Sequence, residues 1–117
     1  RAVNAYHIYQ ADRMIAETNA GGDLVERVIR SIDPDVSFKA VKATRGKVTR
    51  AEPIAALYEQ GRVSHKQGSL EKLEHQLCHY IPGQTSKSPD RLDALVWALT
   101  ELMLEQGAIS SPKAWIA

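Results

Sequence analysis

The chain has a single cysteine, Cys78, among its 117 residues. One thiol excludes an internal disulfide and most cysteine-based metal sites, and it is typical of a reducing compartment. Cys78 lies between Leu77 and His79 in an apolar, helix-forming stretch. We therefore expect a buried structural thiol rather than a nucleophile.

An excess of charge of one sign and long apolar runs are also missing. The formal net charge is +1, so affinity for nucleic acid would have to come from a local cluster of cations. No apolar run approaches the roughly 20 residues that a membrane-spanning helix needs, and no signal peptide is recognisable. The chain begins at Arg1 rather than at a methionine, which indicates a fragment. We expect one small domain without a membrane segment.

What the sequence does contain is an alternation of helical and extended patterns. Hydrophobic periodicity predicts helices over about 2–11, 23–32, 49–60, 69–80 and 89–106, and short strands over about 13–18, 36–43 and 62–66. Thr49 and Glu52 have the spacing of a capping box at the start of the third helix. This order favours an α/β domain with a short, largely parallel sheet of about three strands flanked by helices. Residues 107–117 show no clear period.

Two carboxylates stand at the start of the last predicted helix. Ser88 is the expected N-cap, Pro89 suits the first helical position, and Asp90 follows where the helix dipole favours negative charge. Asp93, three residues on, shares a helix face with Asp90. With a third carboxylate the pair could hold a divalent metal; plain helix capping is the alternative.

Glu17 is the candidate for that third carboxylate. It ends the first predicted strand, just before a glycine turn, and ligands of open α/β sheets bind beyond the carboxyl ends of the strands. Magnesium and manganese prefer carboxylate oxygens, and paired metals can drive phosphodiester cleavage. A solvated glutamate at a strand end is the alternative.

A basic run without interleaved acids covers the end of the second predicted strand and the loop that follows it. Its members are Lys39, Lys42, Arg45, Lys47 and Arg50. Such a cluster can bind the phosphate backbone of DNA, although a solvated loop has the same composition.

The histidines and the tryptophan of the last helix carry less information. His65, His75 and His79 lack a zinc-binding pattern, although His65, at the end of the third strand, has the better claim to lie near a site. Trp97 falls on the core stripe of the last helix, so we expect neither a catalytic nor a stacking role for it.

Several separated motifs together resemble one family. They are IAETNAGGD (15–23), KATRGK (42–47), RAEP (50–53), YEQGRV (58–63) and SPDRLDAL (88–95). In this order they resemble the carboxyl-terminal nuclease domain of the large terminase subunit of tailed bacteriophages and prophages. The likeness covers roughly residues 1–105, and it implies a nuclease domain over 1–106 followed by a tail over 107–117.

The resemblance implies a ribonuclease H-like fold and a metal-dependent endonuclease. Such an enzyme cuts concatemeric double-stranded DNA during genome packaging in the cytoplasm of the bacterial host, with the portal protein and the small terminase subunit as partners of the full-length protein. It also implies two Mg²⁺ or Mn²⁺ ions held by three acidic positions. The second position matches Glu17, and the third matches Asp90, with Asp93 as a direct ligand or a supporting residue.

The resemblance also implies DNA contacts for the basic run and an incomplete set of acids. Lys42, Arg45, Lys47 and Arg50 are the expected DNA-binding residues. The family's first acid lies upstream of the motifs found here, so we expect this chain to be inactive or very weak as an isolated nuclease. The alternatives are a non-catalytic DNA- or portal-binding module and another ribonuclease H-like nuclease, such as a junction resolvase.

Overall fold

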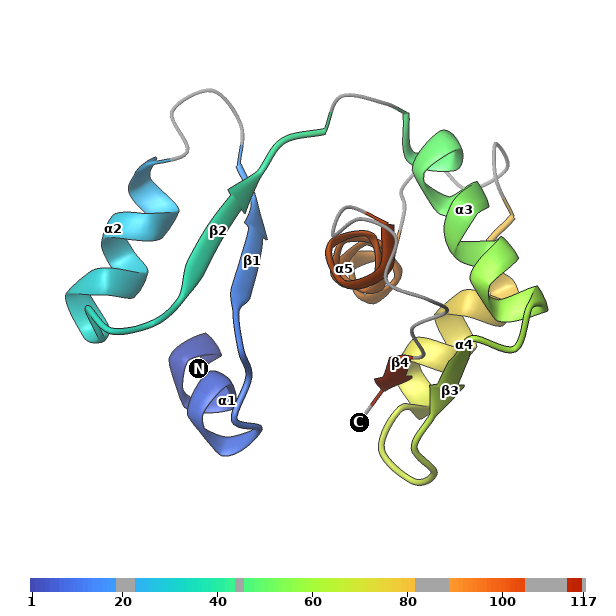
Figure 1. Cartoon of the computed structure of the whole chain (residues 1–117), viewed down its shortest axis with the longest axis horizontal. Coiled ribbons are helices and arrows are strands. Elements are labelled where there is room, and N and C mark those ends of the chain that lie inside the picture. Colours follow the sequence, from blue (N-terminus) through green and yellow to red (C-terminus); the bar gives the residue numbers. More distant parts are fainter. Residues whose placement is uncertain (19–22, 44–45, 82–88, 105–113, 117) are drawn as a thin grey trace. The chain divides into compact units, whose positions relative to one another are not determined.

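The computed structural model of the chain describes residues 1–18, 23–43, 46–81, 89–104 and 114–116. Its contacts form two compact units, Arg1–Thr44 and Arg45–Ala117, and Figure 1 shows the elements of each. Within the described residues, no helix is long and apolar enough to cross a membrane.

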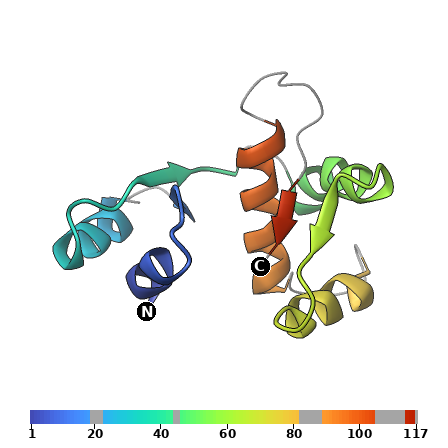
Figure 2. The same ribbon diagram turned by 60° about the horizontal axis from the view of Figure 1, so that its bottom comes forward.

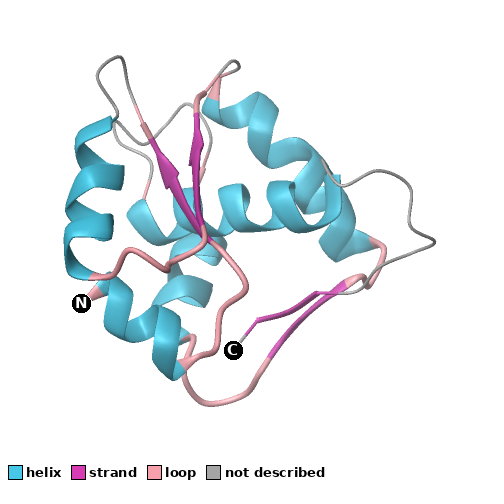
Figure 3. Ribbon diagram, turned by 60° about the vertical axis from the view of Figure 1, so that its left-hand side comes forward, coloured by secondary structure: helices cyan, strands magenta, loops and turns pink. Residues whose placement is uncertain are grey.

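The described part of the first unit contains two helices and a pair of parallel strands. Along the chain they are α1 (Ala2–Ile8), β1 (Met14–Glu17), α2 (Asp23–Ile32) and β2 (Phe38–Val41). Met14 lies opposite Phe38 and Glu17 opposite Val41, and Figure 3 shows the two strands side by side. Parallel strands need a crossover connection, and the segment containing α2 provides it.

Local interactions stabilise the second half of α2 and account for its end. Arg30 donates through Nε to Glu26 at 2.8 Å, one turn away along the helix. The helix ends where Asp33 accepts a hydrogen bond at 3.0 Å from the backbone N–H of Asp35, because an aspartate that bonds the backbone two residues on favours a turn. Pro34 between them cannot continue the helix.

The second unit consists of helices around one apolar core, with a second strand pair. Its elements are α3 (Lys47–Glu59), β3 (Val63–His65), α4 (Glu71–His79), α5 (Asp90–Leu99), the π-helical turn η1 (Thr100–Leu104) and β4 (Ala114–Ile116). Eight buried side chains form the core: Ile54, Leu57, Val63, Leu73, Leu92, Leu95, Val96 and Leu99. Helix α5 supplies four of them at helical spacing, which orients the start of this helix.

The strand β4 was not expected from the sequence. Its residues pair in parallel with β3, with Val63 opposite Ala114 and His65 opposite Ile116, and Figure 2 shows the two arrows adjacent. A three-residue strand is too short to display a period, so its partner alone reveals it. The predicted α/β class with short parallel sheets is confirmed, and the described strands form two pairs rather than one sheet of three.

Two expected helix starts are wrong. Helix α3 begins at Lys47 after Gly46, without a side-chain cap, so Thr49 and Glu52 do not form a capping box at its start. The carbonyl of Gly46 accepts from the N–H of Arg50 at 3.1 Å, which closes the first turn two residues early. Pro89 is the N-cap of α5 rather than its first helical residue, because its ψ of 136° is extended; Ser88 lies outside the described residues.

Cys78 is exposed, so the expectation of a buried thiol is wrong. The face of α4 that packs on the core carries Leu73, which is buried, and Leu77, which is half-buried. A residue that directly follows Leu77 is turned by about 100° around the helix, which points it away from the core.

Candidate functional site

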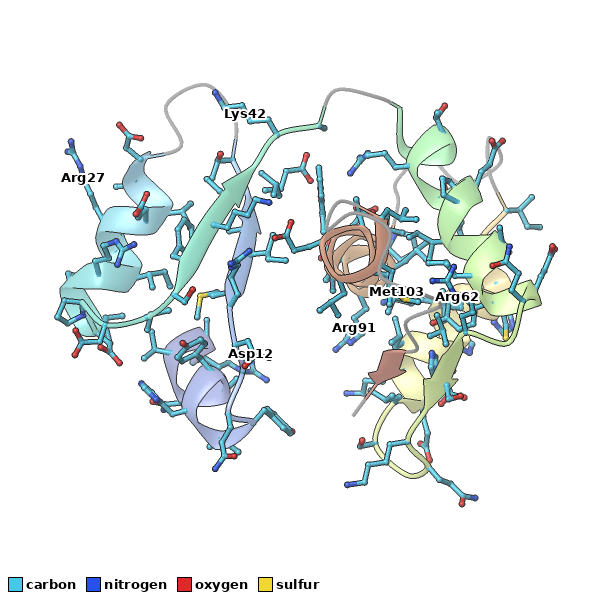
Figure 4. All side chains as sticks on the ribbon, viewed as in Figure 1. Asp12, Arg27, Lys42, Arg62, Arg91 and Met103 are labelled. Carbon is cyan, nitrogen blue, oxygen red and sulfur yellow. The ribbon has the colours of Figure 1, made fainter. Side chains whose placement is uncertain are left out.

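Glu17 lies at the carboxyl end of β1, where the parallel pairing makes two strand ends coincide. Its side chain is exposed, whereas the next residue, Thr18, is buried and its N–H donates to the carbonyl of Val41 at 2.9 Å. Because Glu17 is opposite Val41, Lys42 follows at the same edge of the sheet. Figure 4 shows Lys42 at this end of β2 and Asp12 by the opposite, amino end of β1. The acidic residue Glu17 and the basic residue Lys42 therefore lie at the same carboxyl edge of the β1–β2 pair.

Asp90 and Asp93 both lie in the first turn of α5. Asp90 is the first helical residue and is exposed, and Asp93 is half-buried. The N–H of Asp93 donates to the carbonyl of Pro89 at 3.1 Å, which closes the first turn. Both carboxylates are thus positioned by a helix whose apolar residues are anchored in the core of the second unit.

The N-terminus of α5 is capped from another helix. The Oε1 atom of Gln76, on α4, accepts hydrogen bonds from the N–H of Arg91 at 3.1 Å and the N–H of Leu92 at 3.2 Å. These are the second and third helical positions, whose donors a capping side chain normally takes. Capping of these two donors therefore does not account for the acids of α5. The helix dipole favours both carboxylates whatever else they do.

Arg50 and Trp97 form the other notable contact of the second unit. The guanidinium carbon of Arg50 lies 4.8 Å from the centroid of the Trp97 ring. Both residues are half-buried, and Trp97 is not part of the buried core cluster. Trp97 was expected on the core stripe of α5, but its ring lies against the Arg50 guanidinium instead. The sequence pattern predicted burial for Trp97 because Trp97 directly follows Val96, which is buried in the core.

The four predicted DNA-binding residues are described to different extents. Lys42 is exposed beside the end of β2 in the first unit. Lys47 starts α3 in the second unit, but its side chain and all of Arg45 lie outside the described residues. Arg50 projects from the first turns of α3 onto Trp97. The basic run is thus divided between the two units.

The donor chemistry of the three acids suits a hard divalent cation, because carboxylate oxygens are what Mg²⁺ and Mn²⁺ prefer. Glu17 belongs to the first unit, and Asp90 and Asp93 belong to the second. Among the described residues, no three His, Cys, Asp or Glu side chains gather into a metal-binding group. The assignment of Glu17, Asp90 and Asp93 as metal ligands remains a prediction.

Sequence reasoning missed Gln76 as the residue that caps α5. It lies 15 residues before Arg91 in the chain, and a glutamine in the middle of a helix has no local signature of a cap for a later one. Only the packing of α4 against α5 brings its amide oxygen to the helix start.

Comparison with known families identifies the chain. The family model of the terminase RNaseH-like domain matches residues 1–102. The chain therefore belongs to this family, and the predicted resemblance and ribonuclease H-like fold class are confirmed. No curated protein and no solved structure matches the chain significantly.

Proposed function

We propose that this terminase RNaseH-like domain is the metal-dependent endonuclease of a bacteriophage or prophage terminase large subunit, which cuts concatemeric double-stranded DNA during genome packaging. The observation that carries the proposal is that the backbone N–H groups at the N-terminus of α5 already have a capping partner. Gln76 already binds the N–H groups of Arg91 and Leu92, while Asp90 exposes its carboxylate in the same turn. These features favour a ligand role for Asp90 over a capping role.

Glu17 and Asp90 are the proposed ligands of Mg²⁺ or Mn²⁺, and Asp93 is the second candidate on α5. When bound, divalent cations lower the pKa of a water molecule and offset the charge that develops on the leaving oxygen of a phosphodiester. The proposed reaction is in-line hydrolysis without a covalent intermediate on the protein. Lys42, Arg45, Lys47 and Arg50 hold the DNA backbone, a role that positions the substrate without reading its sequence.

The proposed setting is the packaging complex in the host cytoplasm. The portal protein and the small terminase subunit are the proposed protein partners there. These partners follow from the family and not from a surface of this chain.

Calorimetric titration with Mn²⁺ tests the ligand assignment. We expect Glu17→Gln and Asp90→Asn each to weaken Mn²⁺ binding, with a smaller effect for Asp93→Asn. Asp12→Asn is the matched control, because Asp12 is an exposed acid close to the amino end of β1 instead of its carboxyl end. Equal Mn²⁺ affinity in the wild type, Glu17→Gln and Asp90→Asn would refute the assignment.

Cleavage of supercoiled plasmid DNA tests the reaction itself. Only two of the family's three acidic positions have counterparts among the motifs of this chain, so we expect little cutting by the 117 residues alone. The assay therefore uses a terminase large subunit that contains the domain, in which Asp90→Asn should abolish cutting in Mg²⁺. DNA binding with no cutting in Mg²⁺ or Mn²⁺ would favour the non-catalytic module instead.

A further inference from the structure

Arg50 has an arrangement that its place in a basic run does not explain. Its guanidinium lies over the Trp97 ring at 4.8 Å, and among the described residues its Nε atom is buried without a hydrogen-bond partner. A solvated arginine in a loop would keep all of its donors in water. Buried donors without a protein partner are rare, and they call for a specific explanation such as a bound water, an ion or a ligand.

The ring beneath Arg50 lies on the same helix face as the two acids. Asp90, Asp93 and Trp97 follow one another at spacings of three and four residues on α5, so their side chains form one stripe. Arg50 reaches this stripe from α3. The contact therefore brings a cation to the helix face that carries the proposed metal ligands.

Stacking suits an arginine for phosphate binding. A guanidinium is planar, and the aromatic ring covers one flat side while the edge keeps its donors in a fork that fits two phosphate oxygens. The ring also restricts the rotation of a long side chain, so less freedom is lost when the phosphate binds. A lysine ammonium at this position would lack both properties.

We propose that Trp97 is a positioning residue that holds the Arg50 guanidinium on the acidic face of α5, where Arg50 binds a DNA phosphate. The inference rests on the proposed nuclease function, and it assigns to one residue pair a substrate contact on the helix face that carries Asp90 and Asp93.

A double-mutant cycle on DNA binding separates positioning from a merely structural contact. Binding of the chain to a short fluorescein-labelled DNA duplex is measured by anisotropy over a range of salt concentrations. We expect Arg50→Gln to weaken binding and to lower the salt slope by about 1, as the loss of one phosphate contact does. We expect Trp97→Met to weaken binding several-fold in the wild type but not in the Arg50→Gln background. Trp97→Phe, which retains a ring, should retain most of the affinity.

Two further variants keep the test decisive if Trp97→Met fails to fold. Arg50→Lys leaves Trp97 in place and retains the charge. We expect this variant to bind the DNA duplex nearly as weakly as Arg50→Gln does. Lys66→Gln removes one exposed cation beyond the end of β3 and should bind like the wild type. Full affinity of Arg50→Lys, or equal losses for Trp97→Met in both backgrounds, would overturn the proposal while leaving the nuclease function standing. A wild-type chain that binds no duplex DNA would overturn both.

Discussion

The hydroxyl of Tyr58 and the Nε2 atom of His65 are 2.7 Å apart, joining the last turn of α3 to β3. The two rings meet edge to face at a centroid distance of 5.5 Å. The Nδ1 atom of His65 faces a carboxylate oxygen of Glu74 at 3.7 Å. A carboxylate on that side favours the proton on Nδ1, so Nε2 accepts the hydrogen bond and Tyr58 donates it.

This arrangement predicts a loss of stability in alkaline solution. Burial raises the pKa of Tyr58 above its ordinary value of 10.0, and the charge of Glu74 raises it further. The unfolded chain then releases the tyrosine proton at a lower pH than the folded chain does. The contribution of Tyr58 is therefore complete below pH 10.0 and declines as the pH rises through the folded-state pKa.

Urea unfolding at a series of alkaline pH values tests this dependence. We expect the free energy of unfolding to fall less steeply with pH in Tyr58→Phe than in the wild type. Tyr9→Phe serves as the control, because Tyr9 is 70% exposed. Identical pH slopes for the wild type and Tyr58→Phe would contradict the assignment.

Gln76→Ala should destabilise the second unit. The substitution removes the acceptor of the N–H groups of Arg91 and Leu92, and loss of a helix cap costs about 1 kcal/mol. Gln76→Glu retains an acceptor oxygen and should cost less. Gln67→Ala, in the exposed turn after β3, is the matched control. Thermal unfolding measures the three variants, and a Gln76→Ala protein as stable as Gln67→Ala would show that the cap contributes nothing.

Leu99→Ala should lower the free energy of unfolding much more than Gln76→Ala does, because Leu99 is fully buried, with 0% of its surface exposed. Truncation of a buried leucine costs roughly 2–5 kcal/mol, through lost apolar burial and the cavity that remains. The control is Leu102→Ala, three residues on, where the leucine is 53% exposed and the change should be within about 0.5 kcal/mol. Similar chemical-denaturation curves for the two variants would contradict the assignment of the core.

The lowered pKa of the Asp33 carboxyl predicts a loss of stability in acidic solution. The backbone N–H of Asp35 lowers the pKa of its carboxyl below 3.8, and a hydrogen bond to His7 at 2.6 Å lowers it further. A depressed folded-state pKa means that the stabilising contribution is present above 3.8 and is lost as the pH falls through the folded-state pKa. We expect acid unfolding to depend less on pH in Asp33→Asn than in the wild type.

The control for this prediction is Asp35→Asn, which retains the backbone N–H that bonds to Asp33. Its acid unfolding should follow that of the wild type. A carbon-detected NMR titration of the Asp33 carboxyl gives an independent measurement, and a midpoint at or above 3.8 would refute the prediction.

The sequence predicted the described helices and three of the strands because their periods are local properties. Leu92, Leu95 and Leu99 recur at helical spacing, so α5 was predictable from its own residues. Glu17 was correctly expected at a strand end, since a short apolar run that is followed by glycines in the sequence favours a strand. The order of motifs sufficed for the family, because each motif is local and their spacing along the chain can be read directly.

Tertiary structure decided what depends on residues far apart in the chain. It placed Gln76 where its side chain caps α5, brought the Arg50 guanidinium into contact with the Trp97 ring and paired β4 with β3. It also left Cys78 exposed on α4. Periodicity indicates which side of an element is apolar, but it does not specify the neighbour against which that side packs. That choice follows from the packing of whole elements, and it determines the surroundings of Asp90 and Asp93.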